Sequence, residues 1–189
     1  MTLRPYQTLE CDITQHISDK IYDFLTVKTN LLVNGCIGWQ FINKTELLLD
    51  IPELLDFFAS HKMAVMSASV IILYETGQLP LHIDELPIVA KLNFPVRNTV
   101  GWSTRWFTID TVELDSAPTM TNQFGASVMD LHNIPDQKIT LLAELADMST
   151  PIIFNSRIPH DVIKTSDDCN VPRIIASFTF FNNIEWFLV

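Results

Sequence analysis

The feature that most constrains the fold is a series of short β-prone runs that fills the chain from Lys62 onward. Each run is rich in β-branched and aromatic residues, has the length of one strand, and is separated from the next by Gly, Pro, Asn or Asp. No helical pattern alternates with these runs, which disfavours a parallel α/β sheet and favours an antiparallel sandwich or barrel. The clearest predicted strands are Met63–Tyr74, Pro87–Val96, Thr104–Asp110, Lys138–Leu145, Thr150–Ser156 and Arg173–Phe181.

The first third of the chain shows two patterns with helical spacing instead. Ile13, Ile17 and Ile21 recur every four residues, and Phe24 continues the same face. Pro52 occupies a first-turn position and opens a second apolar pattern. We therefore expect a mainly β protein, a jelly roll with N-terminal helices packed on its outside, in which about residues 1–61 are helical and about 62–189 form the core.

Length and cysteine usage suit one compact domain spanning residues 1–189. The chain is 48% apolar and has no repeat or Gly/Ser linker. Its three cysteines, Cys11, Cys36 and Cys169, are far apart and odd in number, which specifies no disulfide framework and fits a reducing compartment. The first residues lack the pattern of a secretory signal, and no apolar run is long enough to cross a bilayer, so we expect a soluble, cytoplasmic protein.

Charge and missing motifs limit the function classes. Twelve Lys and Arg against 22 Asp and Glu give a formal net charge of −10. Such a field repels DNA, RNA and anionic lipid surfaces, so neither a nucleic-acid partner nor a membrane is expected. The sequence contains no phosphate-binding glycine loop, serine-hydrolase elbow or HExxH motif. It therefore supports none of the corresponding enzyme classes.

The first candidate site is the pair His82 and Asp84, which lies in a short extended segment between prolines. Because side chains of a strand alternate, both would project from one face while Ile83 points away. One strand can then supply two ligands to one metal ion. The motif by itself is weak, since a His-x-Asp also arises by chance.

His160 follows the strand-like segment Thr150–Ser156 and opens another extended piece. In an antiparallel barrel, a late strand can return beside an early one and bring this imidazole to His82 and Asp84. Two imidazoles and one carboxylate are the ligand set expected for non-haem Fe(II), with three positions left open. The alternative is a loop histidine that bonds a backbone carbonyl.

Arg173 opens an otherwise apolar strand, and Ile175 and Ser177 share its face. A buried guanidinium is costly unless an anion meets its fork of donors, so this position predicts a carboxylate or phosphate ligand. The alternative is a strand-end arginine that reaches to water. Arg157 is a rival for the same role, but its surroundings are typical of a surface loop.

In this order, His82, Asp84, His160 and Arg173 resemble the signature of the 2-oxoglutarate- and Fe(II)-dependent dioxygenases. The resemblance covers roughly residues 63–181. Both the AKLNFPVRN segment that follows the His-x-Asp and the run around His160 look like those of small aspartyl/asparaginyl and prolyl hydroxylase-like members. The gap between His160 and Arg173 is longer than is common in that family, and a polar loop supplies the excess at little entropic cost.

The resemblance implies a double-stranded β-helix in which His82, Asp84 and His160 bind Fe(II). It implies that Arg173 holds the distal carboxylate of 2-oxoglutarate. Asn93 and Ser177 are further candidates for binding this cosubstrate: Asn93 alternates with Lys91 toward the interior, unless a bulge turns Leu92 inward instead. Tyr74 is a weaker candidate.

The leading hypothesis is an oxygenase that consumes O₂ and 2-oxoglutarate, releases succinate and CO₂, and hydroxylates an amino acid, a peptidyl side chain or another small metabolite. A second hypothesis is a cupin-like metalloenzyme that does not use 2-oxoglutarate and binds its substrate's own anion at Arg173. A third is a jelly-roll binding module without catalysis, because this architecture also serves proteins that are not enzymes.

Overall fold

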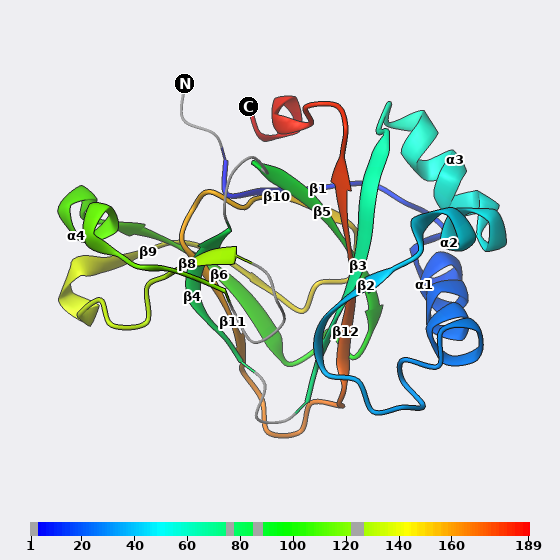
Figure 1. The fold of residues 1–189 in the computed structure, drawn as a ribbon, viewed down its shortest axis with the longest axis horizontal. Helices are drawn as coiled ribbons and strands as arrows, with labels where there is room; N and C mark the ends of the chain where they lie inside the picture. The colour runs from blue at the N-terminus through cyan, green and yellow to red at the C-terminus, as the bar shows by residue number, and fades with distance from the viewer. Residues whose placement is uncertain (1–3, 75–77, 85–88, 122–126) are drawn as a thin grey trace.

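Two antiparallel six-stranded sheets face each other in the computed structural model, which describes residues 4–74, 78–84, 89–121 and 127–189 (Figure 1). We call them sheet A and sheet B. In order across sheet A, the strands are β1 (Tyr6–Thr8), β10 (Ile152–Asn155), β5 (Ala90–Arg97), β12 (Arg173–Phe180), β3 (Val65–Leu73) and β2 (Gly38–Ile42). Across sheet B they are β7 (Thr119–Thr121), β8 (Ser127–Asp130), β4 (Leu79–Asp84), β11 (His160–Lys164), β6 (Trp102–Ile109) and β9 (Ile139–Ala146).

The strand order is that of a double-stranded β-helix. Strands β3 to β6 alternate between the sheets, and β9 to β12 alternate in the same way as the chain returns. The two halves interleave, so that these eight strands read β10-β5-β12-β3 in sheet A and β4-β11-β6-β9 in sheet B. The predicted jelly roll is therefore confirmed, and late strands do lie beside early ones.

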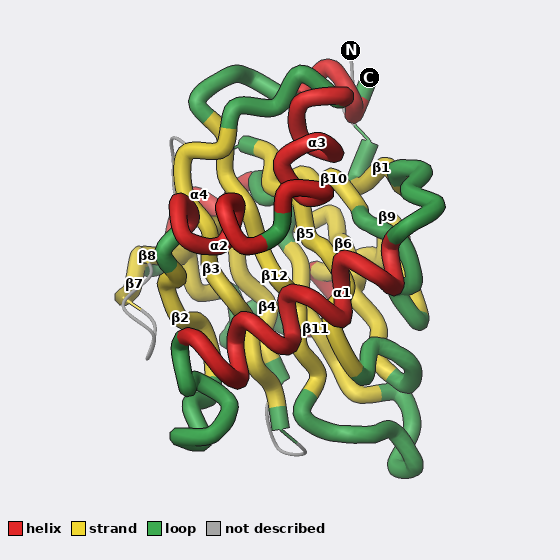
Figure 2. Tube along the Cα trace, turned by 90° about the vertical axis from the view of Figure 1, so that its right-hand side faces the viewer, coloured by secondary structure: helices red, strands yellow, loops and turns green. Residues whose placement is uncertain are grey.

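Helices from the N-terminal third cover the outer face of sheet A (Figure 2). Asn43 caps one of them, because its side-chain oxygen accepts hydrogen bonds from the backbone N–H groups of Thr45 and Glu46. Pro52 begins the next helix at its first turn, as predicted. The helices on this face are α1 (Thr14–Asp23) with the π-helical turn η1 (Phe24–Lys28), α2 (Lys44–Asp50) and α3 (Pro52–Ser60).

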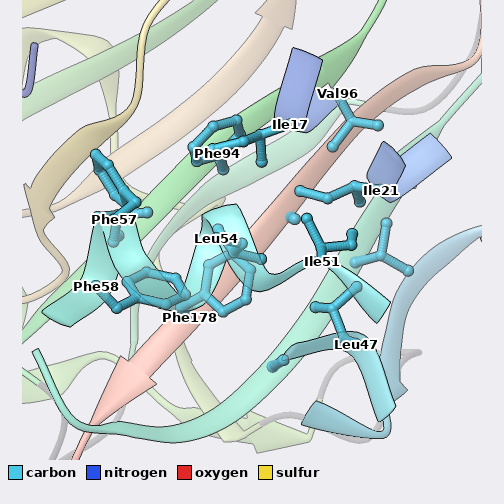
Figure 3. Packing of buried hydrophobic residues seen from close by; sticks show 14 of the residues in the cluster. Ile17, Ile21, Leu47, Ile51, Leu54, Phe57, Phe58, Phe94, Val96 and Phe178 are labelled. Atoms are coloured by element: carbon cyan, nitrogen blue, oxygen red, sulfur yellow. The ribbon is translucent and has the colours of Figure 1, made fainter. Parts of the chain in front are cut away.

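The largest apolar core lies between these helices and sheet A (Figure 3). Ile17 and Ile21 of α1 and Leu54 of α3 are fully buried there against Phe94 and Phe178 of the sheet. Burial of side chains of this size stabilises the fold by roughly 1.5–3 kcal/mol each. The remaining short helices are α4 (Thr111–Ser116), η2 (Asp136–Lys138) and η3 (Glu185–Leu188), and η3 contributes Leu188 to this core.

The N-terminal segment differs in one respect from the helical prediction for residues 1–61. It also contains β1 and β2, which pair with β10 and β3 and form the two edges of sheet A. The sequence of β2, GWQFI, contains aromatic and β-branched residues that favour a strand, and Asn43 ends it by starting α2. No helix among the described residues is long and apolar enough to span a membrane.

Two smaller apolar clusters fill the space between the sheets. One surrounds Trp106 and includes Phe154, and the other joins Trp102 to Leu73 and Val162. A cavity with a polar lining lies between the two clusters, because Phe154 of the first cluster and Val162 of the second both line it.

Leu54 and Leu55 of α3 offer a matched test of the outer core. Leu54 is fully buried, whereas Leu55 is 48% exposed. We expect Leu54→Ala to lower the free energy of unfolding by about 2–5 kcal/mol, because it leaves a cavity between α3 and sheet A. Leu55→Ala should change it by less than about 1 kcal/mol. Urea unfolding of both variants checks this, and equal losses would contradict the packing described.

Candidate metal centre

Three metal-ligating side chains converge inside the barrel. His82 and Asp84 come from β4, and His160 comes from the neighbouring strand β11. His160 lies directly opposite His82 in the antiparallel pair, and their ring centroids are 4.4 Å apart. One ligand atom from each of the three side chains lies within 4.8 Å of the others. The chain thus brings together the two histidines and the carboxylate that the sequence singled out.

A β-bulge between Leu79 and His82 accompanies this convergence. Between the paired positions, β4 has two residues, Pro80 and Leu81, where β11 has one, since Leu79 pairs with Val162 and His82 with His160. Proline cannot donate to a ladder, so a bulge is a position where a strand tolerates it. As a result Leu79 and His82 both face the cavity, and strict alternation then brings Asp84 to the same side.

Backbone carbonyls fix which nitrogen each imidazole offers. Nδ1 of His82 lies 2.6 Å from the carbonyl oxygen of Pro80, and Nδ1 of His160 lies 2.9 Å from that of Ile158. A carbonyl oxygen only accepts hydrogen bonds, so each Nδ1 carries a proton, and the neutral form of each ring offers Nε2 as its ligating nitrogen. This arrangement is the usual way in which proteins orient a metal-binding histidine. His160 does make the backbone hydrogen bond of the alternative prediction, through Nδ1, but it lies on strand β11 and not in a loop.

Electrostatics favour the ligating forms of Asp84 and His160. Burial, the largest influence, raises the pKa of Asp84, but its electrostatic interactions with Lys91, His160 and His82 and its hydrogen bond from Lys91 together outweigh burial and leave this pKa below its usual value. Burial, with help from neighbouring His82, lowers the pKa of His160 to about 3. At neutral pH the centre therefore contains an ionised carboxylate and a neutral imidazole at position 160.

Lys91 is a site residue that was not predicted from the sequence. It projects from β5 of sheet A, and its Nζ lies 2.6 Å from Oδ2 of Asp84. The other carboxylate oxygen, Oδ1, lies 3.9 Å from Nε2 of His82. The available signal was the alternation of Lys91 with Asn93, which placed both on one face of the same strand.

A cavity of about 90 Å³ connects the centre to further polar groups. Trp39 of β2 lies at its wall, in a segment for which the sequence predicted a helix. The lining consists of Trp39, Ile71, Leu79, His82, Asp84, Lys91, Asn93, Thr104, Phe154, His160, Val162, Arg173 and Ser177.

Arg173 is buried in this cavity wall with no counter-charge. It is 3% exposed, and its guanidinium packs over the Trp102 ring at 5.9 Å. Its Nε is buried without a hydrogen-bond partner, and no carboxylate of the described residues lies within 4.0 Å. Burial alone lowers its pKa to about 10. The rival Arg157 is exposed and borders a different, outer groove.

Asn93 and Ser177 face the same cavity from paired positions of β5 and β12. The side-chain oxygen of Asn93 is buried and has no partner. Leu92 lies instead in the outer core beneath the helices, and Tyr74 packs against that same core. The structure thus places Asn93 and Ser177 in the lining of the same cavity as Arg173, and their role in binding a cosubstrate stays a prediction.

The donor set fits a divalent metal. Two imidazole nitrogens and one carboxylate oxygen, all on one side of a cavity, match the arrangement that binds non-haem Fe(II) and leaves further positions open. The neutral imidazole of His160 and the ionised carboxylate of Asp84 are already in the protonation states that a metal ligand requires.

Comparisons with known proteins give likenesses in fold. No family model matches the sequence, and no curated protein matches it. The structure is similar to that of a non-heme monooxygenase, a ThoJ–Ni complex, with 12% sequence identity, 94% of this chain and 74% of that chain covered, and a TM-score of 0.48. It is also similar to the ligand-free L-ribose isomerase of Cellulomonas parahominis, with 12% identity, 66% and 53% coverage, and a TM-score of 0.36.

A further similar structure is the L-ribose isomerase of Geodermatophilus obscurus, with 10% identity, 65% of this chain and 55% of that chain covered, and a TM-score of 0.34. The chain spans about half the length of these two isomerases.

The low pKa of His160 predicts acid sensitivity of the metal-free protein. Unfolded histidine takes up a proton near pH 6.5, but folded His160 does so only near pH 3, so the unfolded state binds more protons in between. The free energy of unfolding should be fully retained above pH 6.5 and should fall as pH drops toward 3, by at most about 1.4 kcal/mol per pH unit.

Urea unfolding at several pH values between about 7 and about 5 measures this slope. His160→Leu should flatten it relative to the wild type. Leu55→Ala, which alters an exposed side chain that does not titrate, should retain the wild-type slope. Identical slopes in the wild type and His160→Leu would show that this histidine is not held neutral by the fold.

Proposed function

We propose that the protein is an Fe(II)- and 2-oxoglutarate-dependent oxygenase. It hydroxylates an amino acid, a peptidyl side chain or another small metabolite and releases succinate and CO₂. One observation carries this proposal: the His82, Asp84 and His160 ligand set opens onto a cavity that also contains Arg173, a buried guanidinium without a counter-charge.

The ligand set supports the iron-binding part of the proposal. His82 and His160 would bind through Nε2, and Asp84 through a carboxylate oxygen, so all three protein ligands come from sheet B. When bound, iron together with 2-oxoglutarate and O₂ supplies the oxidising power to break a C–H bond, and the protein supplies orientation and a protected cavity.

Arg173 supports the 2-oxoglutarate part. A buried guanidinium without a partner is unfavourable, and a carboxylate that binds both of its terminal nitrogens offsets that cost. Asn93 and Ser177 lie on the same wall and can donate hydrogen bonds from an amide and a hydroxyl. A dicarboxylate fits this pair of features, because one end can reach the metal while the other is held by Arg173.

The cavity walls favour oxidation chemistry over hydrolysis by bulk water. Ile71, Leu79, Phe154 and Val162 are apolar and line the cavity beside the ligands. An apolar lining keeps water out and strengthens the interactions of the charges inside it. The net charge of −10 makes a small metabolite or a peptidyl side chain a better substrate than a nucleic acid.

Two other functions use the same residues. A cupin-like metalloenzyme that does not use 2-oxoglutarate would bind the metal in the same way and use Arg173 for the anion of its own substrate. A jelly-roll module without catalysis would not require a metal. The two experiments below separate all three.

The first experiment measures metal binding and turnover. Anaerobic titration should show one Fe(II) per chain, and aerobic incubation with 2-oxoglutarate should then release succinate, faster when the correct substrate from a metabolite and peptide panel is present. A variant carrying both His82→Ala and Asp84→Ala loses two of three ligands, so it should lose both metal binding and succinate release. Equal, negligible metal uptake by both proteins would favour the non-catalytic module.

The second experiment tests Arg173. In metal-loaded protein, Arg173→Met should weaken 2-oxoglutarate binding by roughly 10- to 150-fold, because a charge-assisted bidentate contact contributes about 1.5–3 kcal/mol. Calorimetric titration measures this affinity. Arg157→Met, which removes an exposed arginine, should leave it unchanged. Metal-dependent turnover that consumes no 2-oxoglutarate would favour the cupin-like alternative instead.

A further inference from the structure

The two oxygens of Asp84 have different neighbours. Oδ2 is engaged by the Lys91 ammonium at 2.6 Å, whereas Oδ1 faces Nε2 of His82 at 3.9 Å. Both side chains are largely buried, with 18% of Lys91 and 14% of Asp84 exposed. Lys91 reaches this carboxylate from the opposite sheet, so the contact crosses the barrel interior.

Separation of the Lys91 ammonium from Oδ2 of Asp84 would cost free energy. A buried ammonium that loses its partner bears a desolvation cost of several kcal/mol. Among the described residues, Asp84 provides the one carboxylate within 4.0 Å of its Nζ. Oδ1 has no such cation beside it, and it is the oxygen that faces the imidazole of His82.

A carboxylate can bind a metal through one oxygen or through both. We propose that Lys91 is a positioning residue that keeps Asp84 a one-oxygen ligand by holding Oδ2. This inference rests on the metal centre of the proposed function and assigns a role to a residue outside its ligand set. The consequence is that three coordination positions stay open, whereas a two-oxygen Asp84 would leave two.

Bound Mn(II) provides a readout that needs neither 2-oxoglutarate nor turnover. The enhancement of water-proton relaxation by the protein-bound ion scales with the number of its water ligands. Lys91→Met keeps the length of the side chain but removes its donor and its charge. It should lower the relaxation enhancement per bound Mn(II) by about one third, the change expected when three open positions become two.

Two further variants make the result specific. Lys91→Arg restores a long cationic donor and should return the enhancement toward the wild-type value. Lys20→Met removes a comparable ion pair, to Glu53 on α3, far from the cavity lining, and should change nothing. Stoichiometry measured in parallel gives the amount of bound Mn(II) for each variant.

An unchanged enhancement in Lys91→Met with full Mn(II) occupancy would overturn the inference and leave the proposed metal centre intact. Loss of Mn(II) binding by a folded Lys91→Met protein would also overturn it, because Lys91 would then maintain the whole site rather than one ligand's binding mode. Failure of the wild type to bind Mn(II) or Fe(II) would instead remove the metal centre itself.

Discussion

The register between β4 and β11 is the constraint on which the site depends. A one-residue change in the pairing of two strands turns every side chain to the opposite face. The bulge between Leu79 and His82 makes this adjustment within β4, so Leu79 as well as His82 and Asp84 faces the cavity beside His160. The same bulge leaves the Pro80 carbonyl in reach of His82, which orients the imidazole that the register has brought inward.

Charges in the barrel are divided between the two sheets. Sheet B carries the carboxylate and the two imidazoles, and sheet A carries both cations, Lys91 and Arg173. The Lys91 charge is met by Asp84 from the facing sheet, and the Arg173 charge is met by no described carboxylate. Because an unpaired buried charge is costly, the position of Arg173 in the wall is a stronger indication of an anionic ligand than the shape of the cavity.

Much of the fold was predictable, because the strands after Lys62 are long and uniform in character and no helix pattern interrupts them. The alternation rule was enough to place His82 and Asp84 on one face and Ser177 with Arg173 on another. The meeting of His160 with His82 required the interleaved topology, which is typical of a jelly roll but is specified by no local stretch of sequence.

The sequence did not predict strand β2 or the contact between Lys91 and Asp84, because both depend on contacts between residues far apart in the chain. The strand β2 is short and lies between helices, so its pairing with β3 depends on tertiary contacts rather than on its own propensity. Trp39 was missed as a wall residue for that reason. The contact between Lys91 and Asp84 joins strands of opposite sheets, and no local pattern specifies which side chains meet across a barrel.

The N-terminal third of the chain covers the outer face of sheet A and also supplies its two edge strands, β1 and β2. Together they close sheet A on both sides, one beside β10 and the other beside β3. Shortening the chain to its jelly-roll residues would uncover two rows of unpaired backbone groups as well as the apolar surface under the helices. The jelly-roll strands therefore depend on the N-terminal segment for the cover of their edges, and a shortened chain is expected to self-associate through the uncovered edges of sheet A.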